Sequence, residues 1–410
     1  MSARFASTHA PRHRADSAYS WAVAAATLAL ASLSFGAVMS IPILFGPIAR
    51  DFGWHHGRVA MVHTGAMVCA GLFSIVFGRL LDRRGFFPIA VCGALATGTG
   101  LVLVSRATSF WEMALAFGLL VGALGQGAFF SPLAAAVSHW FDRHRGIAVA
   151  IALSGQSIGG FLVPPLLRVA AEHVGWRSAL QAYGLLCSAG MLVAATLYLP
   201  APPPTHVASD PARSPAGGRR GTRITLLLGA VLFCSNTATF GIAGHMVAYG
   251  GSIGMGPAAA GALMSVLFGV TLFSRLGVGA WLARGGAFRS MVMMCLLHMA
   301  GAWLVFASSS AWSLMAGLLA TGLGFGGYLP AFGSLVRSMF PAREAGRRLS
   351  ELYLLGFFGA GAGTWLVGAL RDLRGGAWDA AFLAMAVLAS VGPAILLARR
   401  REMEQTRTSP

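Results

Sequence analysis

One arginine stands inside an apolar segment that is long enough to cross a lipid bilayer. Arg275 lies within residues 258–282, which hold no other charged side chain. An arginine at the centre of a membrane helix costs about 2.5–3.5 kcal/mol on insertion scales, so it is kept where it is compensated or used. Its guanidinium keeps its charge and presents a fork of donors that matches a carboxylate. The residue indicates an anion site, and the alternative is an arginine that reaches the membrane surface and fixes topology.

The polar groups near Arg275 in the sequence are neutral. Thr271 is one helical turn away on the same face and could donate a hydroxyl to a bound carboxylate, or bond its own helix backbone instead. The carboxylates nearest to a helix interior, Glu112 and Glu351, lie at the starts of apolar segments. A carrier of cationic drugs would need a buried acid, so the pattern favours an anionic cargo.

Three histidines lie well inside apolar segments and are the side chains that could titrate near neutral pH. They are His63, His245 and His298. We take His63 and His245 as candidate proton sites, with plain packing or an interface role as the alternative for all three.

The sequence offers no chemistry of an enzyme or a primary pump. It has no nucleotide-binding motif and no His/Cys/Asp cluster with metal-ligand spacing. Its five cysteines fall in five separate apolar segments and are typical of small packing residues. We therefore expect a protein that is not an enzyme and has no cofactor and no bound metal.

Composition places these residues in a membrane. The chain has 410 residues, of which 56% are hydrophobic and 10% charged, against a usual charged share of about 25%. The net charge of +17 comes from arginine alone, because the chain has no lysine. Since the charges lie between apolar segments rather than on one face, we expect a lipid bilayer and no nucleic acid as the partner.

Twelve apolar segments have the length of a membrane helix. They predict an all-α membrane protein with a cytoplasmic N-terminal tail (1–19), a six-helix half (20–199), a linker (200–222), a second six-helix half (223–398) and a C-terminal tail (399–410). The linker is rich in Pro, Ser, Gly and Arg. Of the 30 arginines, 22 lie in the tails and loops on one side, 7 on the other, and Arg275 in neither. This bias predicts that both termini and the linker are cytoplasmic.

The two halves resemble each other at an offset of about 200 residues. "GRLLDRRG" (78–85) recurs as "GAWLARGG" (279–286), and "GWRSALQ" (175–181) is echoed by "AWDAAFL" (377–383). Parallel repeats of this kind place a substrate site near the bilayer midplane between the halves.

Three motifs carry a resemblance to a known family. "GRLLDRRG" resembles the pattern that the major facilitator superfamily has in its 2–3 loop. "DSAYSW" (16–21) and "WFDRHRGIAVAIALSGQSIG" (140–159) resemble two signatures of its monocarboxylate transporter branch. The resemblance covers essentially residues 15–400. It implies the major facilitator fold and a rocker-type carrier of small organic anions, often moved with protons.

The resemblance also assigns candidate roles to residues of this chain. It implies that Arg275 takes the substrate carboxylate, that Thr271 stands where the family has an acid, and that Ile43, after Pro42, replaces a frequent lysine. Because the first, fourth, seventh and tenth helices line the family's cavity, Tyr328, Gln126 and Asn236 join Arg275 and Thr271 of the eighth helix as candidate substrate-binding residues. For Tyr328 the alternative is an interface tyrosine, and for the two amides it is a helix-to-helix contact. The candidate gating residues are Gly78, Asp82, Arg83, Arg84, Arg143 and Arg145.

The sequence therefore predicts a multi-pass protein of the bacterial inner membrane that works as a monomer. We expect a secondary transporter of small monocarboxylates or related organic anions by alternating access, either proton-linked or exchanging anions. The alternatives are an exporter of neutral amphiphilic compounds, with a structural Arg275, and a sensor that binds an anion without moving it.

Overall fold

A computed structural model of the protein describes residues 14–203, 219–340 and 342–400. Among these residues, twelve helical spans are long and apolar enough to cross a membrane, which confirms the predicted all-α membrane fold. The predicted linker and tails lie largely outside the described residues. The seventh span begins at Arg219, which is within the range predicted as linker.

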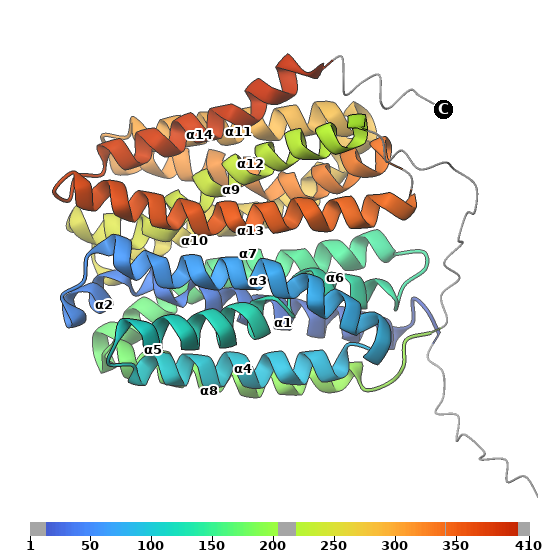
Figure 1. Ribbon diagram of the computed structural model, residues 1–410, viewed down its shortest axis with the longest axis horizontal. Coiled ribbons are helices and arrows are strands. Elements are labelled where there is room, and N and C mark those ends of the chain that lie inside the picture. The colour runs from blue at the N-terminus through green and yellow to red at the C-terminus, as the bar shows by residue number, and fades with distance from the viewer. Residues whose placement is uncertain (1–13, 204–218, 341, 401–410) are drawn as a thin grey trace, which may run out of the picture.

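The helices form two groups that follow each other along the chain (Figure 1). The first group comprises α1 (Ala18–Ile43), α2 (Phe45–Phe52), α3 (His56–Arg84), α4 (Phe87–Arg106), α5 (Phe110–Leu115), the π-helix η1 (Ala116–Gln126), α6 (Ser131–Ser138), α7 (Arg145–Val174), α8 (Trp176–Ala195) and the 3-10 helix η2 (Thr196–Tyr198). The second group comprises α9 (Arg219–Ser252), α10 (Pro257–Gly285), α11 (Ala287–Phe306), α12 (Ala311–Met339), α13 (Ala342–Leu373) and α14 (Asp379–Ala398).

The long helices lie side by side, so the bundle has two ends (Figure 1). We call the end where η2 finishes and α9 begins the linker end; α1 begins and α14 ends there as well. The opposite end, where α3 begins and α13 ends, is the far end. Across the two halves, α7 packs against α10 and α3 against α13.

Matching close approaches within each half support the internal repeat. The first helix of each half packs on the fifth, as α1 on α7 and α9 on α13. A Cβ at Gly159 of α7 would overlap the Ser32 carbonyl of α1, and a Cβ at Gly363 of α13 would overlap the Thr237 carbonyl of α9. In lipid the hydrophobic effect does not drive helices together. Small residues stabilise the pairing instead, because they let the two backbones approach closely.

Two spans are less regular than hydropathy predicts. The first apolar segment forms two helices that meet at Leu44, just after Pro42. The fourth span consists of α5, η1 and α6, and the amide N–H of Gly127 bonds the Gly122 carbonyl five residues back. π-helical turns are rare and often occur at functional sites. Here the irregular segment carries Gln126 and Phe130, which line the central cavity.

Candidate functional site

A cavity lies between the two halves, with walls from α1, α3, α7 and the fourth span on one side and α9, α12 and α13 on the other. The space that the centre of a water molecule can occupy in it is about 40 Å³. The lining includes three amide side chains, those of Gln126, Gln156 and Asn236. The rest of the lining is apolar or aromatic.

Arg275 is buried at the contact between the halves, with 4% of its surface exposed. Its guanidinium donates to the Leu153 carbonyl and, at 3.2 Å, to Oε1 of Gln156, both on α7. Its Nε is a buried donor that has no hydrogen-bond partner among the described residues. Both partners of the guanidinium are neutral, so the site is electropositive. Gln156 lines the cavity and thereby connects Arg275 to it.

The cavity amides offer hydrogen-bonding groups from three helical segments. Gln126 accepts from the Ser34 hydroxyl at 2.7 Å through Oε1, which leaves its NH₂ group as a donor. Gln156 is arranged in the same way, because its Oε1 accepts from Arg275. Asn236 donates to the Leu232 carbonyl at 2.8 Å, which leaves its Oδ1 as an acceptor. The two glutamines can therefore donate to an anion in the cavity.

Three of the five predicted binding residues lie outside the cavity lining: Arg275, which is connected to it through Gln156, and also Thr271 and Tyr328. The Thr271 hydroxyl donates to the Phe268 carbonyl at 2.6 Å and bonds the Ser157 hydroxyl of α7 at 2.5 Å. Tyr328 is fully buried, and its ring packs against His298 of α11, with the ring centroids 5.4 Å apart. Thr271 therefore joins the halves beside Arg275, whereas Tyr328 packs inside the second half.

The two candidate proton sites also lie away from the cavity lining. His63 is fully buried in α3. His245 bonds the Thr364 carbonyl of α13 at 2.8 Å and packs against the Phe45 ring, with centroids 4.9 Å apart. Among the described residues, neither imidazole lines the cavity or is a hydrogen-bond partner of Arg275.

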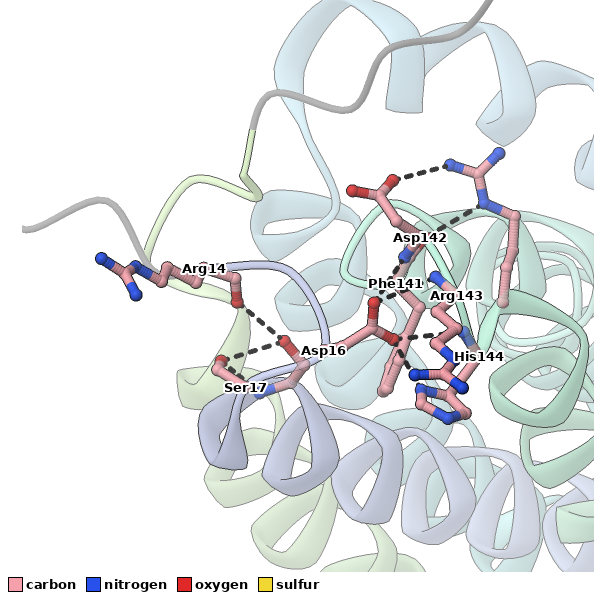
Figure 2. Close-up of polar contacts among 9 residues, drawn as sticks. Arg14, Asp16, Ser17, Phe141, Asp142, Arg143 and His144 are labelled. Carbon is pink, nitrogen blue, oxygen red and sulfur yellow. Dashed lines mark hydrogen bonds and ion pairs between the residues drawn. The ribbon is translucent and has the colours of Figure 1, made fainter.

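Two motifs that are about 125 residues apart meet at the linker end. Figure 2 shows the Asp16 carboxylate pointing at the backbone of the loop before α7. It accepts from the amide N–H groups of Asp142, Arg143 and His144 at 3.2, 3.0 and 3.2 Å, and contacts Nδ1 of His144 at 3.1 Å. The Arg143 N–H bond is the main cause that lowers the pKa of Asp16 to about 2.

Aromatic rings reinforce this contact. Trp21 lies edge-on to Phe141, with centroids 5.0 Å apart, and Tyr19 lies 5.5 Å from Trp140. The motifs at 16–21 and 140–159 thus form one structural unit within the first half. In it, Arg143 contributes its backbone while its side chain is exposed, and Arg145 donates to the Phe141 carbonyl at 3.2 Å.

The other candidate gating residues lie at the end of α3. Asp82, Arg83 and Arg84 are exposed, and Gly78 is half-buried one turn earlier. Burial and the Arg145 charge lower the pKa of His139, and the Asp82 carboxylate opposes them. Asp82 therefore lies near the loop that Asp16 holds, on the same half of the molecule.

Sequence reasoning missed Gln156 and Tyr353. Gln156 stands inside the quoted "SGQSIG" segment, so the signal was present, but nothing in the sequence says which face of α7 meets Arg275. Tyr353 of α13 lines the cavity and lies within electrostatic range of Arg275. Among the described residues, no group of three His, Cys, Asp or Glu side chains is arranged to hold a metal ion.

Known proteins resemble this chain over most of its length. Human monocarboxylate transporter 11 is 28% identical over 392 residues, covering 90% of this chain and 81% of its own length. Monocarboxylate transporter 13 of Bos taurus is 27% identical over 393 residues, covering 93% and 89%. Among solved structures, a bacterial homolog of the human lysosomal transporter Spinster, inward-facing and occupied, has a TM-score of 0.73 at 18% identity. It covers 96% of this chain and 100% of its own, and at this identity it shows the fold.

The family model of the Major Facilitator Superfamily matches residues 26–309 and 226–410. Relatives and fold are those of transporters, not of enzymes. The chain is thus a multi-pass membrane transporter related to the monocarboxylate transporters, and it belongs to the major facilitator superfamily.

Proposed function

We propose that this transporter moves a small monocarboxylate, or a related organic anion, by alternating access, and that Arg275 attracts the carboxylate. The observation that carries the proposal is the buried guanidinium with two neutral partners, the Leu153 carbonyl and Gln156. A buried charge without a counter-charge is costly. A substrate anion would supply the counter-charge, and the NH₂ groups of Gln126 and Gln156 would share its oxygens.

The proposed coupling follows from the cavity lining. Bringing one anion into a cell that is negative inside costs about 2.3 kcal/mol per 100 mV, so a companion cation or an exchanged anion must help. No carboxylate or histidine is among the described residues that line the cavity. We propose that any proton travels on the substrate, or that the protein exchanges anions, with His63 and His245 as the remaining candidates for a proton site.

Orientation and location complete the proposal. We propose that both termini and the linker lie in the cytoplasm, which the arginine bias favours. We also propose that the transporter has no cofactor, works as a monomer and lies in an inner membrane.

The test is substitution of Arg275 in purified, reconstituted protein. Arg275→Lys keeps the charge and loses the fork, and Arg275→Gln loses both. We expect counterflow of labelled pyruvate, lactate or another small monocarboxylate to fall at least about 30-fold in Arg275→Gln, because removing one member of a buried, hydrogen-bonded charge pair costs about 2 kcal/mol or more. Counterflow should also fall in Arg275→Lys, because a point charge cannot replace the bidentate fork. The matched control is Arg289→Gln, which removes an exposed arginine at the start of α11. Normal transport by Arg275→Gln would refute the anion site.

A second candidate function is favoured by the aromatic share of the cavity wall, which would also suit a neutral amphiphile. Thermal stabilisation of the purified protein by carboxylates, but not by neutral compounds of the same shape, separates the two. Binding without counterflow would instead indicate a sensor.

A further inference from the structure

The wall of the central cavity is built mainly from aromatic rings of both halves. Phe35 of α1, Phe240 of α9 and Phe325 of α12 form one group, in which Phe240 lies edge-on to the other two at centroid distances of 6.4 and 5.9 Å.

A second group of rings also lines the cavity. Phe130 lies edge-on to Phe357 at 5.0 Å and to Tyr353 at 5.5 Å. Five phenylalanines and a tyrosine thus surround a cavity that also has Met67, Leu232 and Leu329 in its wall.

The hydrogen-bonding groups of the cavity are few and partly used. Gln126 is engaged with Ser34, Gln156 with Arg275, and Asn236 with its own helix. What remains is the two glutamine NH₂ groups, which suit a single carboxylate, one N–H and the Oδ1 of Asn236, and the Tyr353 hydroxyl. A further polar group on the ligand would find a partner only at Asn236 or Tyr353 and would face the rings elsewhere, and burying a polar group without a partner costs free energy.

We propose that the preferred substrates are monocarboxylates with an apolar body, either branched alkyl or aryl, rather than hydroxy or oxo acids such as lactate and pyruvate. This inference rests on the proposed function, since it assumes that Arg275 attracts the carboxylate, and it assigns the aromatic rings to the remainder of the molecule. Burying a methylene contributes about 0.8 kcal/mol, so each added methylene that fits should tighten binding about fourfold.

The experiment measures binding by titration calorimetry to the full chain in lipid nanodiscs at neutral pH, because apolar acids cross lipid unaided and would obscure uptake. Two matched pairs isolate the polar group: propanoate against lactate, and phenylacetate against mandelate. A third pair, phenylacetate against phenylacetamide, isolates the charge. We expect phenylacetate to bind most tightly, and each hydroxy acid more weakly than its partner.

Variants assign the effect to the rings. We expect Phe240→Leu to weaken phenylacetate binding about three- to tenfold, the range of a lost aromatic contact, and to leave acetate binding within twofold, which also shows that the variant is folded. The control is Phe382→Leu in α14, a buried ring that packs on Tyr249 at 5.2 Å and does not line the cavity. It should change neither ligand by more than twofold.

The outcomes separate the two proposals. If lactate and pyruvate bind more tightly than propanoate and phenylacetate, and Arg275→Gln abolishes that binding, the inference about the apolar body is overturned and the proposed function stands. Equal shifts for acetate and phenylacetate in Phe240→Leu overturn the inference in the same way. If phenylacetamide binds as well as phenylacetate, or no acid binds, the anion site fails and this inference fails with it.

Discussion

The two ends of the molecule are held together in different ways. At the far end, hydrogen bonds cross from one half to the other: Asp372 of α13 accepts from the amide N–H groups of His56 and Gly57 at 3.3 and 2.6 Å, and Thr64 of α3 donates to the Gly361 carbonyl at 2.8 Å. At the linker end, the Asp16 contacts lie within the first half (Figure 2).

Hydrogen bonds also cross between the halves away from the far end. Between the two ends, α7 and α10 are joined at Ser265, Thr271 and Arg275. Towards the linker end, the Arg348 guanidinium donates to Glu351 of its own helix at 3.3 Å. Both ends therefore have contacts within one half, and the far end adds hydrogen bonds that cross between the halves. Rigid-body opening of the far end would therefore break a small set of directional bonds and leave each half intact.

The largest effect is expected from Asp372→Ala. The carboxylate caps the first turn of α3, where a negative charge is favourable. Its loss leaves two amide N–H groups without an acceptor and should cost the closed far end about 2–3 kcal/mol, a shift of about 30- to 150-fold in the equilibrium between halves together and halves apart. The measurement is the distance between spin labels at His55 and Ile253, one in each half, in a background without the native cysteines.

The matched control for this change is Asp379→Ala. Asp379 is also at the far end, but it pairs with Arg374 of the same half at 3.8 Å, and both side chains are more than 60% exposed. Exposed pairs contribute little, so the label distances should stay those of the unchanged protein. An Asp372→Ala protein with unchanged distances would show that the far end is held by packing alone.

A smaller effect is expected from Thr64→Val, which keeps the shape and removes one hydroxyl. The lost bond to Gly361 is neutral and should cost the closed far end about 1 kcal/mol, or about fivefold in the same equilibrium. Thr196→Val is the control, because Thr196 bonds only the Val193 carbonyl of its own turn at 2.7 Å. If both variants shift the label distances alike, the cross-half bond has no special role.

The sequence was sufficient for the fold because membrane helices are set by length and hydropathy, which are local properties. It also identified Arg275 as a buried charge. It could not identify the residues that line the cavity. Neighbouring residues of a helix point about 100° apart, so an error of one position in the predicted face exchanges a lining residue for a packed one. Phe325 and Leu329 of α12 line the cavity, whereas Tyr328, next to Leu329, packs against His298.

The sequence also could not predict the contacts between distant segments. Asp16 was recognised as part of a motif, but its partners are backbone N–H groups about 125 residues away. The same holds for Asp372, whose importance depends on where α13 ends relative to the first turn of α3. Backbone donors carry no signature in the sequence, so a carboxylate that caps them is visible only once the helices are packed.

The smallest effect on the two halves is expected from Asp16→Asn, although it should change stability in acid. The pKa of Asp16 is lowered to about 2 from an ordinary 3.8, chiefly by the Arg143 N–H bond. Because the folded pKa lies below the unfolded one, the stabilisation is complete above about pH 4 and is lost as the pH falls towards 2. The thermal midpoint of the unchanged protein should therefore fall more steeply over this range than that of Asp16→Asn.

Asp142→Asn is the matched control, because it removes a carboxylate from the same loop and keeps the three backbone bonds to Asp16. Its thermal midpoint should follow that of the unchanged protein from pH 4 to 2. The label distance between His55 and Ile253 at neutral pH should be the same in all three proteins, since the Asp16 contacts lie within one half. A changed distance in Asp16→Asn would mean that the linker end also controls how the halves meet, and would remove the distinction between the two ends.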